Sequence, residues 1–270
     1  MSRASIHKVP VPFADLYFLR DSMSSILASL RFAAFVAATI ALYIVWWAVS
    51  WVVPNKQLWR QVVFHWWSRT FAAIAGMDVE VVGDPPKPPF FLVCNHVSYV
   101  DIPALRLAAN GVFVAKSEVK DWFLAGGMIV NMGNIFIDRK NRRDIPRAGA
   151  EILKKLEGRE GVIVFPEGTS TKGEAVLPFN SSFLEFAART DLPVYYAALR
   201  YVTPNGGPRP SERICWWDDT GFLMHMWRLF SLPSFKSVVA FGDEPILDTD
   251  RKVLASKLHE GVTANFVPML

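Results

Sequence analysis

Residues 90–101 read FFLVCNHVSYVD. The apolar run 90–94 follows a proline-rich stretch at 85–89 and ends at a polar pair, which predicts a buried β-strand. Open α/β sheets place their chemistry at the carboxyl ends of their strands. His96 stands at this end, and Asp101 follows at the expected start of a helix, where its carboxylate can orient the imidazole as a general base. Taken alone, a histidine and an aspartate at this spacing more often cap a helix than form a catalytic pair. The assignment therefore depends on the rest of the chain.

Two further strand ends carry polar side chains. The expected strand 134–137 leads to Arg139, and arginine suits bidentate recognition of phosphate, with a surface salt bridge as the alternative. The expected strand 162–165 leads through a proline to Glu167 and Gly168. The glycine permits an unusual backbone angle, which leaves the glutamate pointing beyond the sheet, where it can hold hydroxyl groups. An ordinary turn is the alternative there.

Strands and helices alternate along most of the chain. Strands are expected at 78–82, 90–94, 112–115, 134–137, 162–165, 194–202 and 237–241, and helices at 118–130, 145–156, 181–188 and 250–266. This alternation predicts an α/β fold with a largely parallel sheet flanked by helices. The expected organisation is a surface segment at 1–29, membrane-anchoring helices at 30–76 and one α/β domain at 77–270.

The hydrophobic content of 51% has a local cause, because residues 32–53 contain no charged side chain. These 22 residues would cover roughly 33 Å as a helix, enough to span a bilayer, although a re-entrant or monotopic helix is a serious alternative. The stretch 58–75 has apolar residues at helical spacing and predicts a helix in the membrane interface, or else one that packs on the core. Three basic residues at 54–73 against two at 12–31 favour a cytoplasmic α/β domain.

The remaining composition excludes several classes of protein. Cys94 and Cys215 form no disulfide framework and have no metal-ligand spacing. The net charge of +4 suits an anionic membrane surface or a phosphorylated substrate, and no basic run is dense enough for nucleic acid. The five histidines are scattered, so no metal site is expected. An aromatic-rich patch at 215–232 is expected to lie on the bilayer or to be covered as core.

Three blocks together resemble a known family. The blocks are Asn95-His96-(x4)-Asp101, residues 133–139 and residues 165–169, and they resemble the ordered motifs of the glycerophospholipid acyltransferases, most closely the 1-acylglycerol-3-phosphate O-acyltransferase branch. The resemblance spans about residues 78–200. It implies an α/β acyltransferase fold, membrane attachment through N-terminal helices, and transfer of a fatty acyl group to a lysophospholipid hydroxyl. Acyl-CoA or acyl carrier protein would supply the acyl group as co-substrate, with no further cofactor.

The resemblance also implies roles for individual residues. His96 would be the catalytic base and Asp101 its orienting partner. Substrate-binding roles would fall to Asn95, Arg139, Glu167, Gly168, Thr169 and Lys172. Backbone amides near Gly168 and Thr169 would be candidates for the oxyanion hole.

Two departures from the family pattern bear on the acceptor. Ser170 and Asn180 stand where many members have a basic residue, and Lys172 is the nearest substitute for the first. Lysophosphatidic acid is the expected acceptor, and another lysophospholipid or a lyso-aminolipid is the alternative. Outside the transferases, the competing hypotheses are a metal-dependent phosphoesterase and a non-catalytic lipid-binding protein.

Overall fold

The chain folds around a seven-stranded sheet. The structure, a computed structural model, describes the backbone of residues 13–121, 125–138, 141 and 143–269, and at 13–22 and 125 it describes the backbone alone. In sheet order the strands are β1 (Met77–Val82), β7 (Phe235–Phe241), β6 (Val194–Val202), β2 (Phe90–Cys94), β5 (Gly161–Val164), β3 (Gly111–Lys116) and β4 (Ile135–Ile137). All neighbouring pairs are parallel except β6 with β7. The predicted α/β fold with a largely parallel sheet is confirmed.

Strand β2 lies in the middle of the sheet and is buried on both faces. Its alternate residues enter two different hydrophobic clusters, because successive side chains of a strand point to opposite faces. Phe90 and Leu92 join the cluster that contains residues of the helices α2 (Lys56–Ala75), α3 (Asp101–Ala109) and α8 (Phe222–Phe230). Phe91 and Val93 join the cluster that contains residues of α5 (Asp144–Glu157), η2 (Ser181–Leu184) and α9 (Arg251–Asn265). Burial on both faces explains why this strand is an unbroken apolar run.

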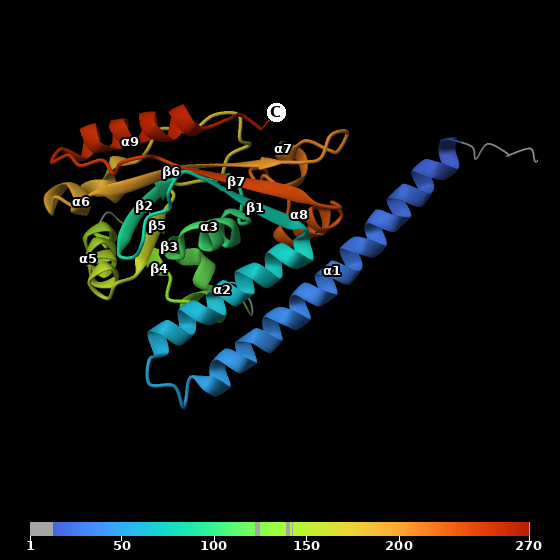
Figure 1. Cartoon of the computed structure of the whole chain (residues 1–270), viewed down its shortest axis with the longest axis horizontal. Coiled ribbons are helices and arrows are strands. Elements are labelled where there is room, and N and C mark those ends of the chain that lie inside the picture. Colours follow the sequence, from blue (N-terminus) through green and yellow to red (C-terminus); the bar gives the residue numbers. More distant parts are fainter. Residues whose placement is uncertain (1–12, 122–124, 139–140, 142, 270) are drawn as a thin grey trace, which may run out of the picture.

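Helices cover both faces of the sheet, with α9 and α2 on opposite sides (Figure 1). The α-helices are α1 (Phe13–Val49), α2 (Lys56–Ala75), α3 (Asp101–Ala109), α4 (Ala125–Asn131), α5 (Asp144–Glu157), α6 (Glu185–Arg189), α7 (Pro210–Arg213), α8 (Phe222–Phe230) and α9 (Arg251–Asn265). Two 3₁₀ helices, η1 (Ser117–Asp121) and η2 (Ser181–Leu184), complete the described elements. The expected helix 181–188 is thus η2 followed by α6.

The predicted helix 118–130 is two short elements, η1 and α4, with residues 122–124 outside the described part of the chain. Gly126 marks their close approach. A Cβ atom at this position would lie 1.9 Å from the carbonyl oxygen of Lys120, so only glycine permits the packing. A continuous helix was expected because apolar periodicity alone does not record such a contact.

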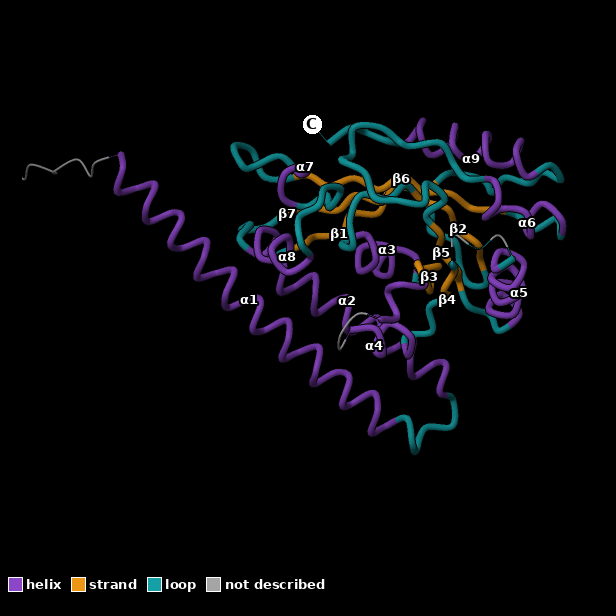
Figure 2. Tube along the Cα trace, turned by 180° about the vertical axis from the view of Figure 1, so that it is seen from behind, coloured by secondary structure: helices purple, strands orange, loops and turns teal. Residues whose placement is uncertain are grey.

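Helix α1 runs through the expected boundary at residues 29 and 30 without a break, and residues 1–12 lie outside the described residues. Within it, Met23–Val49 form a stretch of 27 residues whose most apolar 18-residue window has a mean hydropathy of 2.1, long and apolar enough to cross a membrane. Among the described residues it is the one helix of this kind. A short connection joins α1 to α2, and the two helices run antiparallel (Figure 2).

Helix α2 packs on the sheet with one face. Its side chains at Phe64, Phe71, Ala72 and Ala75 are buried among the residues of the first cluster, while Trp66 is 46% exposed. One face of α2 therefore packs on the core, as the alternative expected, whereas contact of its exposed face with a membrane interface stays a prediction. An apolar stripe at helical spacing suits a membrane interface and a protein core equally, which is why the sequence did not separate them.

Polar contacts fasten α1 along the α/β domain. The Trp67 Nε1–H of α2 donates to Thr39 Oγ1 at 3.1 Å, and the Asn131 amide of α4 donates to the Tyr43 hydroxyl at 2.8 Å. Arg31 donates to three carbonyl oxygens between residues 230 and 233, at the end of α8. Helix α1 therefore lies against the domain over more than three turns, between Arg31 and Tyr43, and its N-terminal turns extend beyond the domain (Figure 1).

Candidate active site

The loop between β2 and α3 brings His96 and Asp101 together. His96 Nδ1 lies 2.7 Å from Asp101 Oδ2, and the backbone amides of Val97 and Ser98 donate to the same oxygen at 2.8 and 3.0 Å. An oxygen that receives two amide protons is an acceptor, so Nδ1 carries the proton of the imidazole. This tautomer leaves His96 Nε2 as the nitrogen that can take a proton.

The two side chains differ in exposure. The carboxyl group of Asp101 is fully buried, whereas 20% of the His96 side chain is exposed. The Phe165 ring stacks on the imidazole, with ring centroids 4.2 Å apart and planes inclined by 14°. The imidazole is thus fixed by a hydrogen bond at Nδ1 and by an aromatic ring on one face, which leaves its outer edge accessible.

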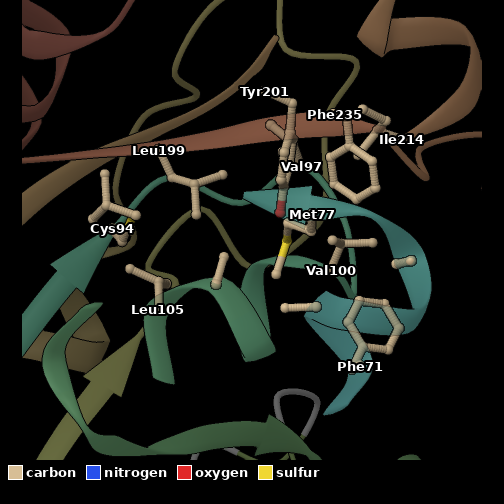
Figure 3. Packing of buried hydrophobic residues seen from close by; sticks show 14 of the residues in the cluster. Phe71, Met77, Cys94, Val97, Val100, Leu105, Leu199, Tyr201, Ile214 and Phe235 are labelled. Carbon is tan, nitrogen blue, oxygen red and sulfur yellow. The ribbon is translucent and has the colours of Figure 1, made fainter. Parts of the chain in front are cut away.

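Tyr201 is a member of the site that sequence reasoning missed. Its hydroxyl donates to Asp101 Oδ1 at 2.7 Å, from strand β6 next to β2. Burial and the charge of Asp101 hold the pKa of the Tyr201 hydroxyl well above its ordinary value, so it remains a donor. Figure 3 shows Tyr201 among the buried apolar side chains, with Val97 and Val100 of the loop. No motif marks this residue, since it lies 100 positions from Asp101.

Glu167 joins the loop after β5 to the loop after β2. The His96 backbone amide donates to Glu167 Oε1 at 2.7 Å, and the Leu177 amide donates to Oε2 at 3.0 Å. Burial raises the pKa of the Glu167 carboxyl to about 7, although both amide hydrogen bonds act in the opposite direction. The backbone carbonyl of His96 is also bound by the loop after β5, because the Thr171 amide donates to it at 2.9 Å. The structure therefore gives Glu167 a positioning role, and its contact with an acceptor stays a prediction.

The neighbouring residues of this loop are more open. Gly168 has φ +78°, which favours glycine, and its amide donates to the Phe165 carbonyl at 3.2 Å. That hydrogen bond removes the Gly168 amide from the candidate oxyanion donors and leaves Thr169, which is exposed. Lys172 is 43% exposed and lies 2.8 Å from a carboxylate oxygen of Glu174. Its ammonium group also lies 5.6 Å from the centre of the Trp217 ring.

Of the predicted substrate-binding residues, one is buried away from the site opening and one lies outside the described residues. Asn95 is 1% exposed, and its amide both donates to the Leu199 carbonyl at 3.0 Å and accepts from the Leu199 amide at 2.7 Å. Its side chain is therefore used to tie β2 to β6, and its predicted role is corrected to positioning. Arg139 lies outside the described residues. It follows β4, whose parallel pairing places the end of that strand at the same edge of the sheet as His96.

The other groups near His96 fit structural roles. Cys94 is buried, and burial raises the pKa of its thiol well above the ordinary value, which opposes its use as a nucleophile. Ser98 is also buried, and its hydroxyl accepts from the Val100 amide at 3.3 Å. Within the part of the chain that the structure describes, no three His, Cys, Asp or Glu side chains gather where they could hold a metal ion.

The fold and the histidine–carboxylate pair at the carboxyl edge of the sheet define a general-base enzyme. Comparison with known proteins specifies the class further. Residues 78–200 match the family model described as Acyltransferase. The chain is 32% identical over 200 residues to the 1-acyl-sn-glycerol-3-phosphate acyltransferase of Neisseria gonorrhoeae, covering 71% of this chain and 76% of the relative. The chain belongs to the glycerophospholipid acyltransferase family and is an O-acyltransferase.

The relatives carry two kinds of name. A lyso-ornithine lipid O-acyltransferase of Pseudomonas aeruginosa is 31% identical over 170 residues, which cover 63% of this chain and 64% of the relative. The crystal structure of the 1-acyl-sn-glycerophosphate acyltransferase PlsC from Thermotoga maritima shares the fold, with TM-score 0.63 and 21% identity. That similarity covers 90% of this chain and 96% of the other. Two acceptor classes are therefore represented among similar proteins.

Replacing Tyr201 with phenylalanine tests the hydrogen bond to Asp101. The substitution leaves Oδ1 of a buried carboxylate without this donor, which we expect to lower the free energy of unfolding by about 1–3 kcal/mol. The carboxylate then orients the His96 imidazole less firmly, so kcat should fall about tenfold, equivalent to about 1.4 kcal/mol in the barrier, while KM changes little. Thermal unfolding and steady-state kinetics, with kcat and KM measured separately, report both effects.

Tyr196→Phe is the matched control, because Tyr196 lies on the same strand but belongs to the opposite face of the sheet. A purely structural role would lower stability without lowering the kcat of the folded enzyme. An unchanged kcat in Tyr201→Phe would therefore contradict a positioning role.

Proposed function

We propose that the protein transfers a fatty acyl group from acyl-CoA or acyl carrier protein to the hydroxyl of 1-acylglycerol-3-phosphate, which gives phosphatidic acid. The observation that carries the reaction is His96 Nδ1 held at 2.7 Å from Asp101, with Nε2 left for the acceptor. Nε2 removes the hydroxyl proton as the acceptor oxygen attacks the thioester carbonyl. The tetrahedral oxyanion then collapses, the carbon–sulfur bond breaks, and the proton passes from the imidazolium to the leaving thiolate.

The charge pattern beyond β4 supports a phosphomonoester acceptor. The residues that follow Asp138 include four cations, at Arg139, Lys140, Arg142 and Arg143. The parallel pairing of β3 and β4 puts Ile137, the last residue of β4, at the edge of the sheet that carries His96, and these cations follow it in the sequence. A phosphomonoester carries a charge between −1.5 and −2 near pH 7, so a cluster of cations suits it better than it suits a zwitterion.

A lyso-aminolipid is the second candidate acceptor, and two side chains favour it. The Ser170 hydroxyl donates to the Trp216 carbonyl, and the Asn180 side chain accepts from the Ser182 amide at the start of η2. Both are neutral where many members of the family have a cation. The similarity to lyso-ornithine lipid O-acyltransferases supports the same alternative.

Membrane attachment in this proposal is monotopic. Between Arg31 and Tyr43, helix α1 is bound to α2, α4 and α8, so a perpendicular crossing would carry these helices into the bilayer. Burial of charged and polar groups in hydrocarbon is costly, which favours a helix that lies in one leaflet. The soluble thioester donors are cytoplasmic, which supports a cytoplasmic orientation for the α/β domain.

The test is an acceptor panel with the purified full chain in detergent. Labelled acyl-CoA and acyl carrier protein would each be offered with lysophosphatidic acid, lysophosphatidylethanolamine or lyso-ornithine lipid. We expect lysophosphatidic acid to be preferred, and we expect Arg139→Gln to raise its KM about tenfold or more. Arg189→Gln is the matched control, because Arg189 is exposed on α6, before the amino end of β6.

Each outcome of this panel is decisive for the acceptor. Preference for lyso-ornithine lipid, with KM insensitive to Arg139→Gln, would replace the first candidate by the second. Equal loss in the Arg139 and Arg189 variants would remove the phosphate-binding role of Arg139.

A further inference from the structure

Helix α8 is apolar on its outward face as well as on its inward face. His225, Met226, Leu229 and Phe230 are buried against the domain. On the outside, Leu223 is 65%, Met224 56% and Trp227 37% exposed, and Trp217 just before the helix is 48% exposed. We refer to these four exposed side chains as the α8 surface. Single exposed apolar residues are ordinary, but a group of large ones on one short helix marks a surface that contacts something apolar.

The α8 surface adjoins the exposed side of α1. Arg31 donates to the carbonyl oxygens of Phe230, Leu232 and Pro233, and the Phe35 ring meets the Phe230 ring edge-on at 5.8 Å. The two helices therefore lie against each other (Figures 1 and 2). Close to Arg31, the large apolar side chains of α1 are exposed, including Leu30 at 65% and Ile26 at 60%.

Helix α8 is also attached to the loop that holds the catalytic pair. Tyr99 of that loop has its hydroxyl 3.1 Å from His225 Nδ1 and its ring 4.9 Å from the Phe222 ring. His225 Nε2 lies 3.0 Å from the Cys215 carbonyl and donates to it, so the Tyr99 hydroxyl is the donor to Nδ1. In addition, the Trp216 amide donates to the Val97 carbonyl at 2.8 Å. These bonds connect the outward-facing helix directly to residues between His96 and Asp101.

We propose that the α8 surface is a second membrane-contact surface, inserted into the same leaflet as α1. Its composition suits the interface of a bilayer, because tryptophan combines an apolar ring with a polar N–H group, and leucine and methionine add apolar area. The exposed cation beside it, Arg228, suits an anionic head-group layer. A bilayer is favoured over a protein partner because α8 packs directly against α1, a helix apolar enough to enter a membrane that also exposes large apolar side chains.

The proposal rests on the membrane attachment stated under the proposed function. Two contacts on one leaflet would fix the tilt of the domain. They would also hold the Tyr99 loop close to the membrane plane, where a lysolipid acceptor resides. The same group of residues thus accounts for an exposed apolar surface and for its bonds to the catalytic loop.

Site-directed spin labelling of the full chain in vesicles of phosphatidylethanolamine and phosphatidylglycerol tests the proposal. The variant Leu223→Cys would carry the label on the α8 surface. Both natural cysteines are buried and will react slowly, so labelling is confined to the introduced position. Leu30→Cys on α1 is the reference for membrane attachment. Val253→Cys is the matched control, because Val253 is 43% exposed on α9, on the other side of the sheet.

Accessibility to oxygen and to a water-soluble nickel complex would be measured for each label. We expect the labels at 223 and 30 to be accessible to oxygen and protected from the nickel complex. The label at 253 should be accessible to the nickel complex and less accessible to oxygen. If the label at 223 behaves like 253 while 30 remains lipid-exposed, the α8 surface does not contact the membrane and the proposal is overturned. If 223 and 30 both behave like 253, the membrane attachment of the proposed function fails as well.

Discussion

Replacing His96 with alanine is expected to lower the rate of acyl transfer by about 10²–10⁴-fold, the usual contribution of a general base. Asp101 would keep its hydrogen bonds from the Val97 and Ser98 amides and from Tyr201. The buried carboxylate therefore remains partnered, and because the His96 side chain is partly exposed, its removal should cost little stability. The measurements are kcat/KM with the preferred acceptor and the midpoint of thermal unfolding.

His65→Ala serves as the control for loss of a histidine. His65 is half-buried on α2, which packs on α3. Its replacement should leave the rate within about twofold, as expected for a site remote from the chemistry. Activity of His96→Ala equal to that of the wild type would refute the role of His96 as base, whichever acceptor is preferred.

The catalytic pair was predictable because it is local in sequence. His96 and Asp101 lie on either side of one strand-to-helix turn, and the apolar run before them identifies the strand. The turn closes through the Asp101 amide, which donates to the Ser98 carbonyl at 3.1 Å. A carboxylate at the first position of the helix then reaches the imidazole without any long-range contact.

The partners of this pair could not be predicted in the same way, because they come from distant strands. Tyr201 and Leu199 lie on β6, about a hundred positions away from the residues that they contact. The sequence shows both as ordinary buried positions of an apolar strand. Glu167 is marked by its loop, but the two amides that bind its carboxylate depend on how the loops after β2 and β5 meet.

The reverse direction of two strands was also beyond sequence reasoning. Strands β1 and β7 pair parallel with each other, but β7 runs antiparallel to β6. Alternation of strands and helices predicts parallel neighbours, and the longer connection between β6 and β7, which contains α7 and α8, does not specify a direction. The choice depends on where α8 packs, against α1 and the end of α2.

Replacing Asp101 with asparagine is expected to separate the charge of this residue from its role in the fold. The amide oxygen can occupy the position of Oδ2 and accept from His96, Val97 and Ser98, while the amide nitrogen faces Tyr201, whose hydroxyl can turn to accept. The hydrogen-bond pattern survives, so the thermal midpoint should change by only a few degrees. Asp101→Ala would instead leave buried donors unpaired and should destabilise the protein by several kcal/mol.

Catalysis should fall by about 10²–10⁴-fold in Asp101→Asn, because no carboxylate remains to compensate the imidazolium that forms as His96 takes the proton. Since Tyr201 acts through this carboxylate, adding Tyr201→Phe to Asp101→Asn should cost little further activity, whereas independent effects would multiply. The measurement is kcat for the two single variants and the double variant, beside their unfolding midpoints. A stable Asp101→Asn protein with wild-type kcat would show that the charge of Asp101 plays no part, and multiplicative losses would show that Tyr201 acts by another route.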